Sequence, residues 1–279
     1  MAPEQKRLLT ITRPSDICWR IAFNAPPDNR LTEDMLGQLL EALDQVELEW
    51  RKQSDWSAQF DVKRKGGAVI LTSEITKFFS NGLDYENSIK NPNFHRDVFN
   101  PVSVRLLTFP MITIAAINGH AFAGGYMMAL LCDFRLMTDG KAWCCMNEID
   151  FGAPMPPFFA NLLHLRLSTT RSANILRKTL LGHRFTAPEL LEEGIVDEIV
   201  PAKQLQERAI QFGNEIGVKS KGGSWGEMKR FAYHDAVSGA TATTGPLMPN
   251  AQAKEFFKRM EEKASFRLDG SGEKIRPKL

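Results

Sequence analysis

The sequence has no apolar stretch approaching the roughly 20 residues that a membrane-spanning helix needs, so no such helix is expected. Its beginning lacks the apolar core of a secretory signal, and we expect no leader peptide. Cysteine is scarce: only Cys18, Cys132, Cys144 and Cys145 occur, in apolar surroundings and without metal-ligand spacing. We therefore expect no disulfide and no metal, but reduced thiols in an intracellular compartment.

An excess of charge of one sign is also lacking. The 279 residues include 35 Lys and Arg against 33 Asp and Glu, giving a net charge of +2. No strong field attracts nucleic acid or an anionic membrane, so neither is an expected partner. The chain is instead rich in apolar residues, 43% of the total, which is ordinary for a globular protein with one large core.

Strand-like and helix-like segments alternate along the first part of the chain. Short apolar runs suited to buried strands are separated by stretches with apolar residues at helical spacing. Thr32, which precedes Glu33 and Asp34, is expected to cap the first of these helices. The alternation predicts an α/β fold with parallel crossovers. The predicted strands are residues 17–23, 68–72, 112–118 and 134–138.

The last part of the chain is different, because helical patterns dominate it. VDEIV at 196–200 is the last strand-like run. We therefore expect residues 1–200 to form the α/β core and residues 201–279 to form a helical C-terminal region. The polar stretch 51–67 is predicted to be an exposed loop. The predicted later helices are 169–182, 186–194, 203–217 and 250–266.

Two glycine-containing stretches share one design. KFFSNGLDY (77–85) and GHAFAGGYMM (119–128) each lead from a strand-like run through a turn into the next segment. Glycine allows a ligand to approach the main chain, and N–H groups freed at such turns favour negative charge. Two such turns facing each other would supply two donors to one developing oxyanion.

A third stretch, CCMNEIDFGAPMPPFF at 144–159, contains a candidate general base. Glu148 has Trp143 and Phe151 among its apolar neighbours, and desolvation of a carboxylate raises its pKa toward the useful range. Asp150 is a rival, because the two side chains would share one face of a strand. A salt bridge or a helix cap is the structural alternative for either carboxylate.

Taken together, these stretches resemble the crotonase, or enoyl-CoA hydratase/isomerase, superfamily. FNAPPDNRL (23–31) resembles its first CoA-contacting turn and FFSNGLD (78–84) its first oxyanion turn. AINGHAFAGGYMMALLCDFRL (116–136) resembles the second oxyanion turn and its helix, and EEGIVDEIVP (192–201) the approach to the C-terminal helices. The resemblance implies the crotonase fold: stacked ββα turns form a spiral core with a helical C-terminal layer.

The same resemblance implies a set of site residues. The N–H groups of Leu83 and Gly124 would form the oxyanion hole, and Glu148 would be the catalytic base. Arg30 would meet a CoA phosphate, although an ordinary surface arginine is equally consistent with the sequence. Residues expected to contact the acyl-CoA are Asp28, Asn29, Arg30, Ser80, Asn81, Gly82, Asp84, Met127, Ile149 and Phe151; Met128, Phe158 and Phe159 are further candidates for an acyl pocket, unless they belong to the core.

Hydratases of this family use two glutamates, and the first of those positions corresponds here to Met127. A single carboxylate suits a different task, which is to remove a proton from one carbon and return it to another. The NE context of Glu148 and the run RSANILRKTLLGHRFTAPELLEEGIVDEIVP (171–201) resemble 3-enoyl-CoA isomerases of the mitochondrial and plant peroxisomal type. The expected reaction converts the 3-ene of an acyl-CoA into the conjugated 2-trans-ene, through a dienolate, in fatty acid β-oxidation.

Other functions are compatible with the same motifs. One is an enoyl-CoA hydratase or another crotonase reaction, including a step of secondary metabolism; another is a catalytically silent acyl-CoA-binding subunit. No cofactor is expected beyond the CoA of the substrate. The resemblance implies a homotrimer or hexamer. The C-terminal Pro277-Lys278-Leu279 is similar to a peroxisomal import signal, with the cytoplasm or mitochondrion as alternative locations.

Overall fold

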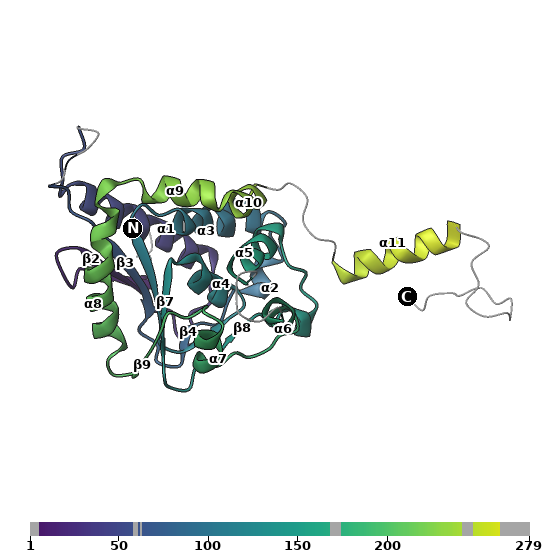
Figure 1. The fold of residues 1–279 in the computed structure, drawn as a ribbon. Coiled ribbons are helices and arrows are strands. Elements are labelled where there is room, and N and C mark those ends of the chain that lie inside the picture. Colours follow the sequence, from purple (N-terminus) through teal and green to yellow (C-terminus); the bar gives the residue numbers. More distant parts are fainter. Residues whose placement is uncertain (1–5, 58–60, 62, 168–173, 242–247, 263–279) are drawn as a thin grey trace.

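A computed structural model describes residues 6–57, 61, 63–167, 174–241 and 248–262 (Figure 1). Its main element is a six-stranded sheet of order β1-β2-β3-β5-β7-β9. β1 is antiparallel to β2, and the other neighbouring strands are parallel. The strands are β1 (Leu9–Thr12), β2 (Cys18–Phe23), β3 (Ala68–Ser73), β5 (Ile112–Ile117), β7 (Phe134–Thr138) and β9 (Glu198–Val200).

A second, three-stranded parallel sheet has the order β4-β6-β8. The chain passes repeatedly from the large sheet to the small sheet and then into a helix. The small-sheet strands are β4 (Phe78–Ser80), β6 (His120–Phe122) and β8 (Cys144–Cys145), and the segments that follow them are α2 (Tyr85–Ser88), α4 (Gly124–Leu131) and the 3-10 helix η2 (Glu148–Phe151). The structure therefore confirms the predicted α/β architecture with its repeated ββα turns.

Helix α1 (Glu33–Arg51) shows how local sequence sets an element. The Thr32 side chain accepts a hydrogen bond from the Met35 N–H at 3.1 Å, and Glu33 and Asp34 lie in the first turn, as predicted. Apolar residues from Met35 to Trp50 recur at helical spacing and are buried. That face, together with α3 (Asn100–Leu107) and α4, packs against one side of the large sheet in the main core.

Helix α8 (Leu205–Gly217) covers the opposite side of the large sheet, against β2, β3, β5 and β7 (Figure 1). The contact is close: a Cβ atom on Gly213 would lie 2.7 Å from the Sγ of Cys18. Strand residues such as Ile70 and Ile114 form a second apolar cluster with this helix. The large sheet is thus buried on both faces, which explains the unbroken apolar runs of its central strands.

A buried ion pair attaches α9 (Trp225–Ala232) to this core. The Lys229 ammonium lies 3.0 Å from both carboxylate oxygens of Asp133, which precedes β7. Asp133 also accepts hydrogen bonds from the Trp225 indole and the Thr113 N–H. Because both charged side chains are almost fully buried, each needs the opposite charge of the other to offset the free-energy cost of its removal from water.

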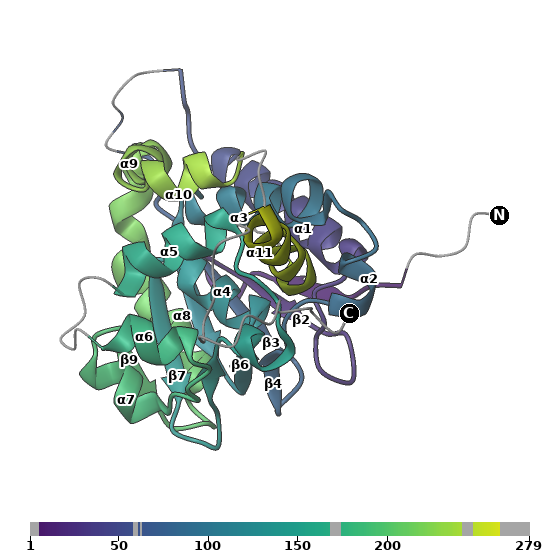
Figure 2. The ribbon, with the colours of Figure 1, turned by 90° about the vertical axis from the view of Figure 1, so that its right-hand side faces the viewer.

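Among the remaining helices, α10 (His234–Gly239) packs on α5 (Pro157–Leu167), while α11 (Pro249–Glu262) extends away from the main body in Figure 1. The others are the π-helix η1 (His95–Phe99), α6 (Ile175–Leu180), α7 (Ala187–Glu192) and the 3-10 helix η3 (Val218–Gly222). η1 contacts α1 and α3, and η3 contacts α8; Figure 2 shows α5, α6, α7 and α10 on the side of the molecule that faces the viewer. Part of the predicted helix 169–182 and the end of the predicted helix 250–266 lie outside the described residues.

Candidate active site

The turns that follow β4 and β6 lie against each other. Gly82, in the first turn, has φ +83°, and a Cβ atom on it would lie 2.8 Å from the carbonyl oxygen of Phe122 and 2.9 Å from the Cβ of Ala123. A Cβ atom on Gly125 would lie 2.2 Å from the carbonyl oxygen of Ser80. Both glycines are therefore required by the close approach of two main chains.

This arrangement leaves two main-chain N–H groups without acceptors. Within the described part of the chain, neither the Leu83 N–H nor the Gly124 N–H donates a hydrogen bond, whereas the adjacent Ala123 N–H donates to the carbonyl of Cys145 at 2.7 Å. A Cβ atom on Gly124 would lie 3.2 Å from the Cγ of Leu83, so the two residues are neighbours. Gly124 also begins α4, whose N-terminus carries partial positive charge. These two N–H groups are suited to stabilising an oxyanion.

A buried amide holds the first turn in place. Asn29 is fully buried, with φ 53°, and its side-chain amide donates to the Ser73 hydroxyl at 2.7 Å and to the Phe79 carbonyl at 3.1 Å. The Ser80 hydroxyl in turn donates to the Asn29 carbonyl at 2.8 Å and accepts from the Gly82 N–H at 3.2 Å. These bonds fix the backbone immediately before Leu83.

Glu148 begins the 3-10 helix η2, just after β8, and its side chain is half-buried. Its Oε2 atom is buried and has no hydrogen-bond partner. Burial disfavours the charged form and raises the pKa of Glu148 to about 7. A carboxyl group with this pKa exchanges a proton readily near neutral pH, as a general base requires.

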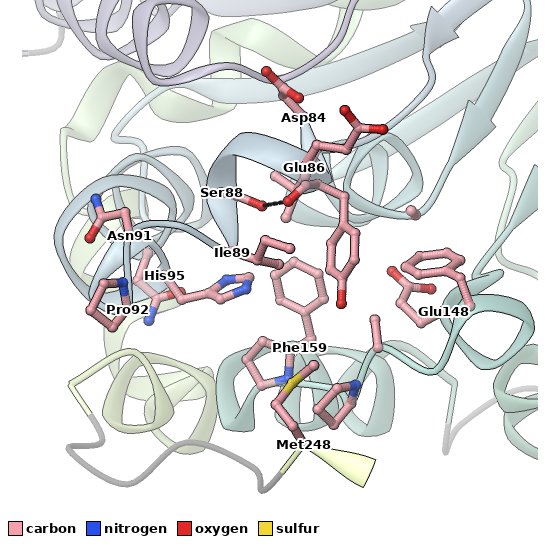
Figure 3. Close-up of a pocket in the computed structure, with 18 of the residues that line it drawn as sticks. Asp84, Glu86, Ser88, Ile89, Asn91, Pro92, His95, Glu148, Phe159 and Met248 are labelled. Atoms are coloured by element: carbon pink, nitrogen blue, oxygen red, sulfur yellow. Dashed lines mark hydrogen bonds between the residues drawn. The ribbon is translucent and has the colours of Figure 1, made fainter. Parts of the chain in front are cut away.

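Glu148, Leu83 and Ala123 line one cavity of about 1040 Å³. In Figure 3, Glu148 points into this cavity from one side, and Phe159 lies in its middle part. The carboxyl group and the turn that carries the two free N–H groups therefore face the same space. That space is large enough to hold the acyl part of a substrate together with its polar attachment.

Besides Leu83 and Glu148, four of the residues predicted to contact the acyl-CoA lie in the wall of this cavity: Arg30, Asn81, Asp84 and Phe151. Asp28 is not part of the wall. Its carboxylate accepts hydrogen bonds from two wall residues, the Arg30 guanidinium at 3.1 Å and the Asn81 amide at 2.6 Å. Asn29, Ser80 and Gly82 shape the turn rather than the wall.

Met127 and Ile149 are not brought to the cavity. Met127 is fully buried in the main core, because α4 is surrounded by protein on all sides. Ile149 is 53% exposed and lies outside the cavity wall. Glu148 and Asp150 were predicted to share a strand face, and this is wrong: the 3-10 helix turns Asp150 to the exposed surface. Among the further acyl-pocket candidates, Phe159 lines the cavity, whereas Met128 and Phe158 are fully buried and lie outside its wall.

Other cavity residues had no signal in the sequence. Tyr85 contacts the Phe151 ring with centroids 5.0 Å apart, and His95 enters from the π-helix. Met248, far along the chain, also lines the cavity (Figure 3). Tyr85 ends the KFFSNGLDY stretch, but nothing in that stretch pointed to its side chain; His95 and Met248 lie outside the motifs, so neither periodicity nor spacing pointed to them.

No helix in the described ranges is both long and apolar enough to cross a membrane. No group of three or more His, Cys, Asp or Glu side chains in those ranges is arranged to hold a metal ion.

Comparison with protein families matches residues 14–243 to the family described as "Enoyl-CoA hydratase/isomerase". The chain is 29% identical to enoyl-CoA delta isomerase 3 of Arabidopsis thaliana over 227 residues, which cover 77% of this chain and 87% of that protein. It is 33% identical to the mitochondrial enoyl-CoA delta isomerase 1 of Mus musculus over 189 residues, covering 66% of this chain and 60% of the mouse protein. It is 32% identical to the peroxisomal enoyl-CoA delta isomerase 2 of Arabidopsis thaliana over 169 residues, covering 57% of this chain and 68% of that protein. The chain thus spans less than two thirds of the mouse protein.

Among solved structures, the fold is similar to human mitochondrial delta3-delta2-enoyl-CoA isomerase. The TM-score is 0.62 at 23% sequence identity, and the match covers 92% of this chain and 99% of the human chain. At this identity the similarity shows the fold.

Proposed function

Because the chain belongs to the enoyl-CoA hydratase/isomerase family, we propose that it converts 3-enoyl-CoA into the conjugated 2-trans-enoyl-CoA. One observation carries the proposal: the half-buried Glu148, whose Oε2 has no partner, lines the same cavity as the turn that presents the Leu83 and Gly124 N–H groups. The names of the curated relatives support the same reaction.

In the proposed mechanism the thioester oxygen accepts hydrogen bonds from the N–H groups of Leu83 and Gly124. The Glu148 carboxylate removes a proton from C2, and the C–H electron pair moves into a dienolate whose charge lies on that oxygen. The protonated Glu148 then donates the same proton to C4, and the double bond of the product lies between C2 and C3. One proton and one electron pair are relocated, so no cofactor is needed beyond the CoA of the substrate. A pKa of about 7 leaves Glu148 able to act first as a base and then as an acid.

A hydratase reaction is less well supported, because adding water uses a second acid at the reacting carbons. The position that this second glutamate takes in hydratases is Met127, which lies in the core. Two other carboxylates border the cavity, Asp84 and Glu86, but in Figure 3 they lie at its edge, well apart from Glu148. Glu148 is the one of these three carboxylates that has a buried oxygen without a partner and a raised pKa, and a single such group favours proton transfer over hydration.

The CoA part would leave the cavity past Arg30. Its guanidinium is half-exposed, and it donates to the carbonyl oxygens of Asn81 and Leu83 at 3.2 and 3.3 Å. An arginine held against the oxyanion turn in this way is suited to bind a phosphate group at the cavity mouth.

The decisive experiment uses 3-hexenoyl-CoA and 2-hexenoyl-CoA as separate substrates. Ultraviolet absorbance follows formation of the conjugated enoyl thioester from the first and its loss by hydration of the second. We expect conjugation without hydration. Glu148→Gln should lower turnover by about 10²–10⁴-fold while binding of the CoA thioester is retained. Asp150→Asn, an exposed carboxylate two residues away, is the matched control and should keep full turnover.

Near wild-type turnover of Glu148→Gln would refute the assignment of the base. Hydration of 2-hexenoyl-CoA without conjugation of 3-hexenoyl-CoA would instead establish a hydratase. Binding of both thioesters with no reaction would establish a silent acyl-CoA-binding subunit.

We also propose that the enzyme acts in peroxisomal fatty acid β-oxidation as a homotrimer or hexamer. The support for this location is the terminal Pro277-Lys278-Leu279, which lies outside the described residues, together with the peroxisomal isomerase among the relatives. The oligomer is expected from the resemblance to the crotonase superfamily alone. A fluorescent protein fused to the C-terminus should block import, while an N-terminal fusion should reach peroxisomes. Equal localisation of both fusions would contradict the import signal, and light scattering of the purified protein would give its oligomeric state.

A further inference from the structure

The side of the cavity that faces Glu148 in Figure 3 is not purely apolar, because His95 points into it there. His95 begins the π-helix η1, and Asn100, the residue that follows this helix, also lines the cavity. π-helical turns are rare and occur frequently at functional sites. The Asn100 N–H donates to the His95 carbonyl, and this wider turn brings side chains five residues apart toward one face of the helix.

His95 is surrounded by aromatic rings and has no polar partner for its inner nitrogen. The ring centroids of Phe94, Phe99 and Phe159 lie 5.6, 6.1 and 5.7 Å from that of His95. The Nδ1 atom is buried without a hydrogen bond. Burial lowers the pKa of His95, so the ring is neutral and carries one N–H donor and one acceptor nitrogen.

Asn100 is the second polar group of this end, and it is only 7% exposed. Its amide nitrogen donates to the carbonyl of Ala240 at 2.8 Å, which fixes the orientation of the side chain. The Oδ1 atom is left buried and without a partner. Buried side-chain acceptors are normally satisfied, so two such groups in the wall of one cavity require an explanation.

We propose that His95 and Asn100 form a subsite that binds a hydroxyl group on the acyl chain of the CoA thioester. A hydroxyl both accepts and donates, so it matches an imidazole N–H together with the amide oxygen of Asn100. A ketone oxygen only accepts, and a carboxylate would lose its hydration among the phenylalanine rings. This subsite rests on the substrate class of the proposed function, an acyl-CoA, and not on the isomerisation itself, since the hydroxyl is placed on the acyl chain.

The test compares binding of decanoyl-CoA with binding of decanoyl-CoA analogues that carry one hydroxyl group at successive carbons from C6 to C10. Isothermal titration calorimetry measures binding without turnover. We expect the analogue with its hydroxyl at one of these carbons to bind at least about tenfold more tightly than decanoyl-CoA. His95→Phe, which keeps the aromatic shape, should abolish this preference, and Asn100→Leu should reduce it. Asp97→Asn, on the same π-helix but exposed and paired with Arg96, is the matched control and should keep the preference.

No hydroxyl position that binds more tightly, or a preference that survives His95→Phe, would overturn the subsite. Isomerisation of 3-decenoyl-CoA is measured in parallel. If it is absent while the hydroxyl preference is present, the proposed function fails and the subsite stands. If it is present without any preference, the subsite fails and the proposed function stands.

Discussion

The missing side chain of Gly82 allows contact with Ala123: a Cβ atom added at Gly82 would lie 2.9 Å from the Cβ of Ala123 and 3.2 Å from the Gly124 nitrogen. The two turns that hold the free N–H groups therefore meet at a point where neither tolerates extra volume. The spacing between these donors depends on a residue that has no functional group of its own.

Gly82→Ala should displace the first turn and misplace the Leu83 N–H. Loss of one oxyanion donor lowers kcat by about 10²–10³-fold, and we expect a loss of this size. Steady-state kinetics on a 3-enoyl-CoA measures it. Gly194→Ala is a matched control, because Gly194 also has positive φ (+74°) but a Cβ there would meet no atom within 4 Å. An equal loss of kcat in both variants would mean that backbone strain, rather than the turn contact, is responsible.

The raised pKa of Glu148 predicts the pH dependence of the reaction. The carboxylate must be ionised to remove the C2 proton, so kcat/KM should rise about tenfold per pH unit below the pKa of about 7 and level off above it. Initial rates between pH 5 and 9 measure this profile. A rate that stays constant down to pH 5 would exclude Glu148, with this pKa, as the base.

The same shift predicts a change in stability. The pKa of Glu148 is raised from 4.5 to about 7 on folding, so the folded state favours the protonated form. The contribution of this shift to the free energy of unfolding is fully present below pH 4.5 and is lost as the pH rises through about 7. The total loss is about 3 kcal/mol. Glu148→Gln does not ionise, so its free energy of unfolding should exceed that of the wild type at pH 8 but not at pH 4.5.

Urea denaturation of both proteins at the two pH values measures this difference, and the titration of all other groups cancels in the comparison. Asp150→Asn should show no such pH-dependent gain. A Glu148→Gln variant less stable than the wild type at pH 8 would contradict the desolvation of this carboxylate.

The buried pair of Lys229 and Asp133 should contribute to stability rather than catalysis. Lys229→Met leaves the Asp133 carboxylate buried without its compensating charge, which typically costs about 3–5 kcal/mol in the free energy of unfolding. Urea denaturation measures this loss. Lys221→Met, at an exposed position, should change the free energy of unfolding by less than about 0.5 kcal/mol. Equal effects of the two substitutions would show that the pair is not energetically important.

Much of the architecture could be predicted because its physical causes are local. The Thr32 cap, the apolar face of α1 and the doubly buried strands each follow from neighbouring residue types. The small sheet could not be predicted, since its strands have only two or three residues and no periodicity is visible over that length. β1 was also missed, because its LTIT alternates apolar and polar residues over only four positions, the shortest run that indicates a strand.

The candidate site also contains residues that could be found from the sequence and residues that could not. Glu148 and the glycine turns were found from sequence, because an isolated carboxylate and close main-chain contacts leave recognisable residue types. Met127 was placed in the acyl pocket, yet tertiary packing encloses all of α4 in the core. His95 had no signal, because a π-helix differs from an α-helix in hydrogen bonding rather than in composition.

The bonds around Asn29 and Ser80 have a consequence for how this scaffold can diversify. Apart from the Ser73 hydroxyl, the groups that Asn29 and Ser80 engage here belong to the main chain, and none is a side chain of the cavity wall. Apart from Arg30, whose guanidinium donates to the Asn81 and Leu83 carbonyls, wall residues outside the turn can therefore be replaced without removing any of these bonds. Selection on those wall residues can alter which ligands fit the cavity while the hydrogen bonds that hold the turn are retained.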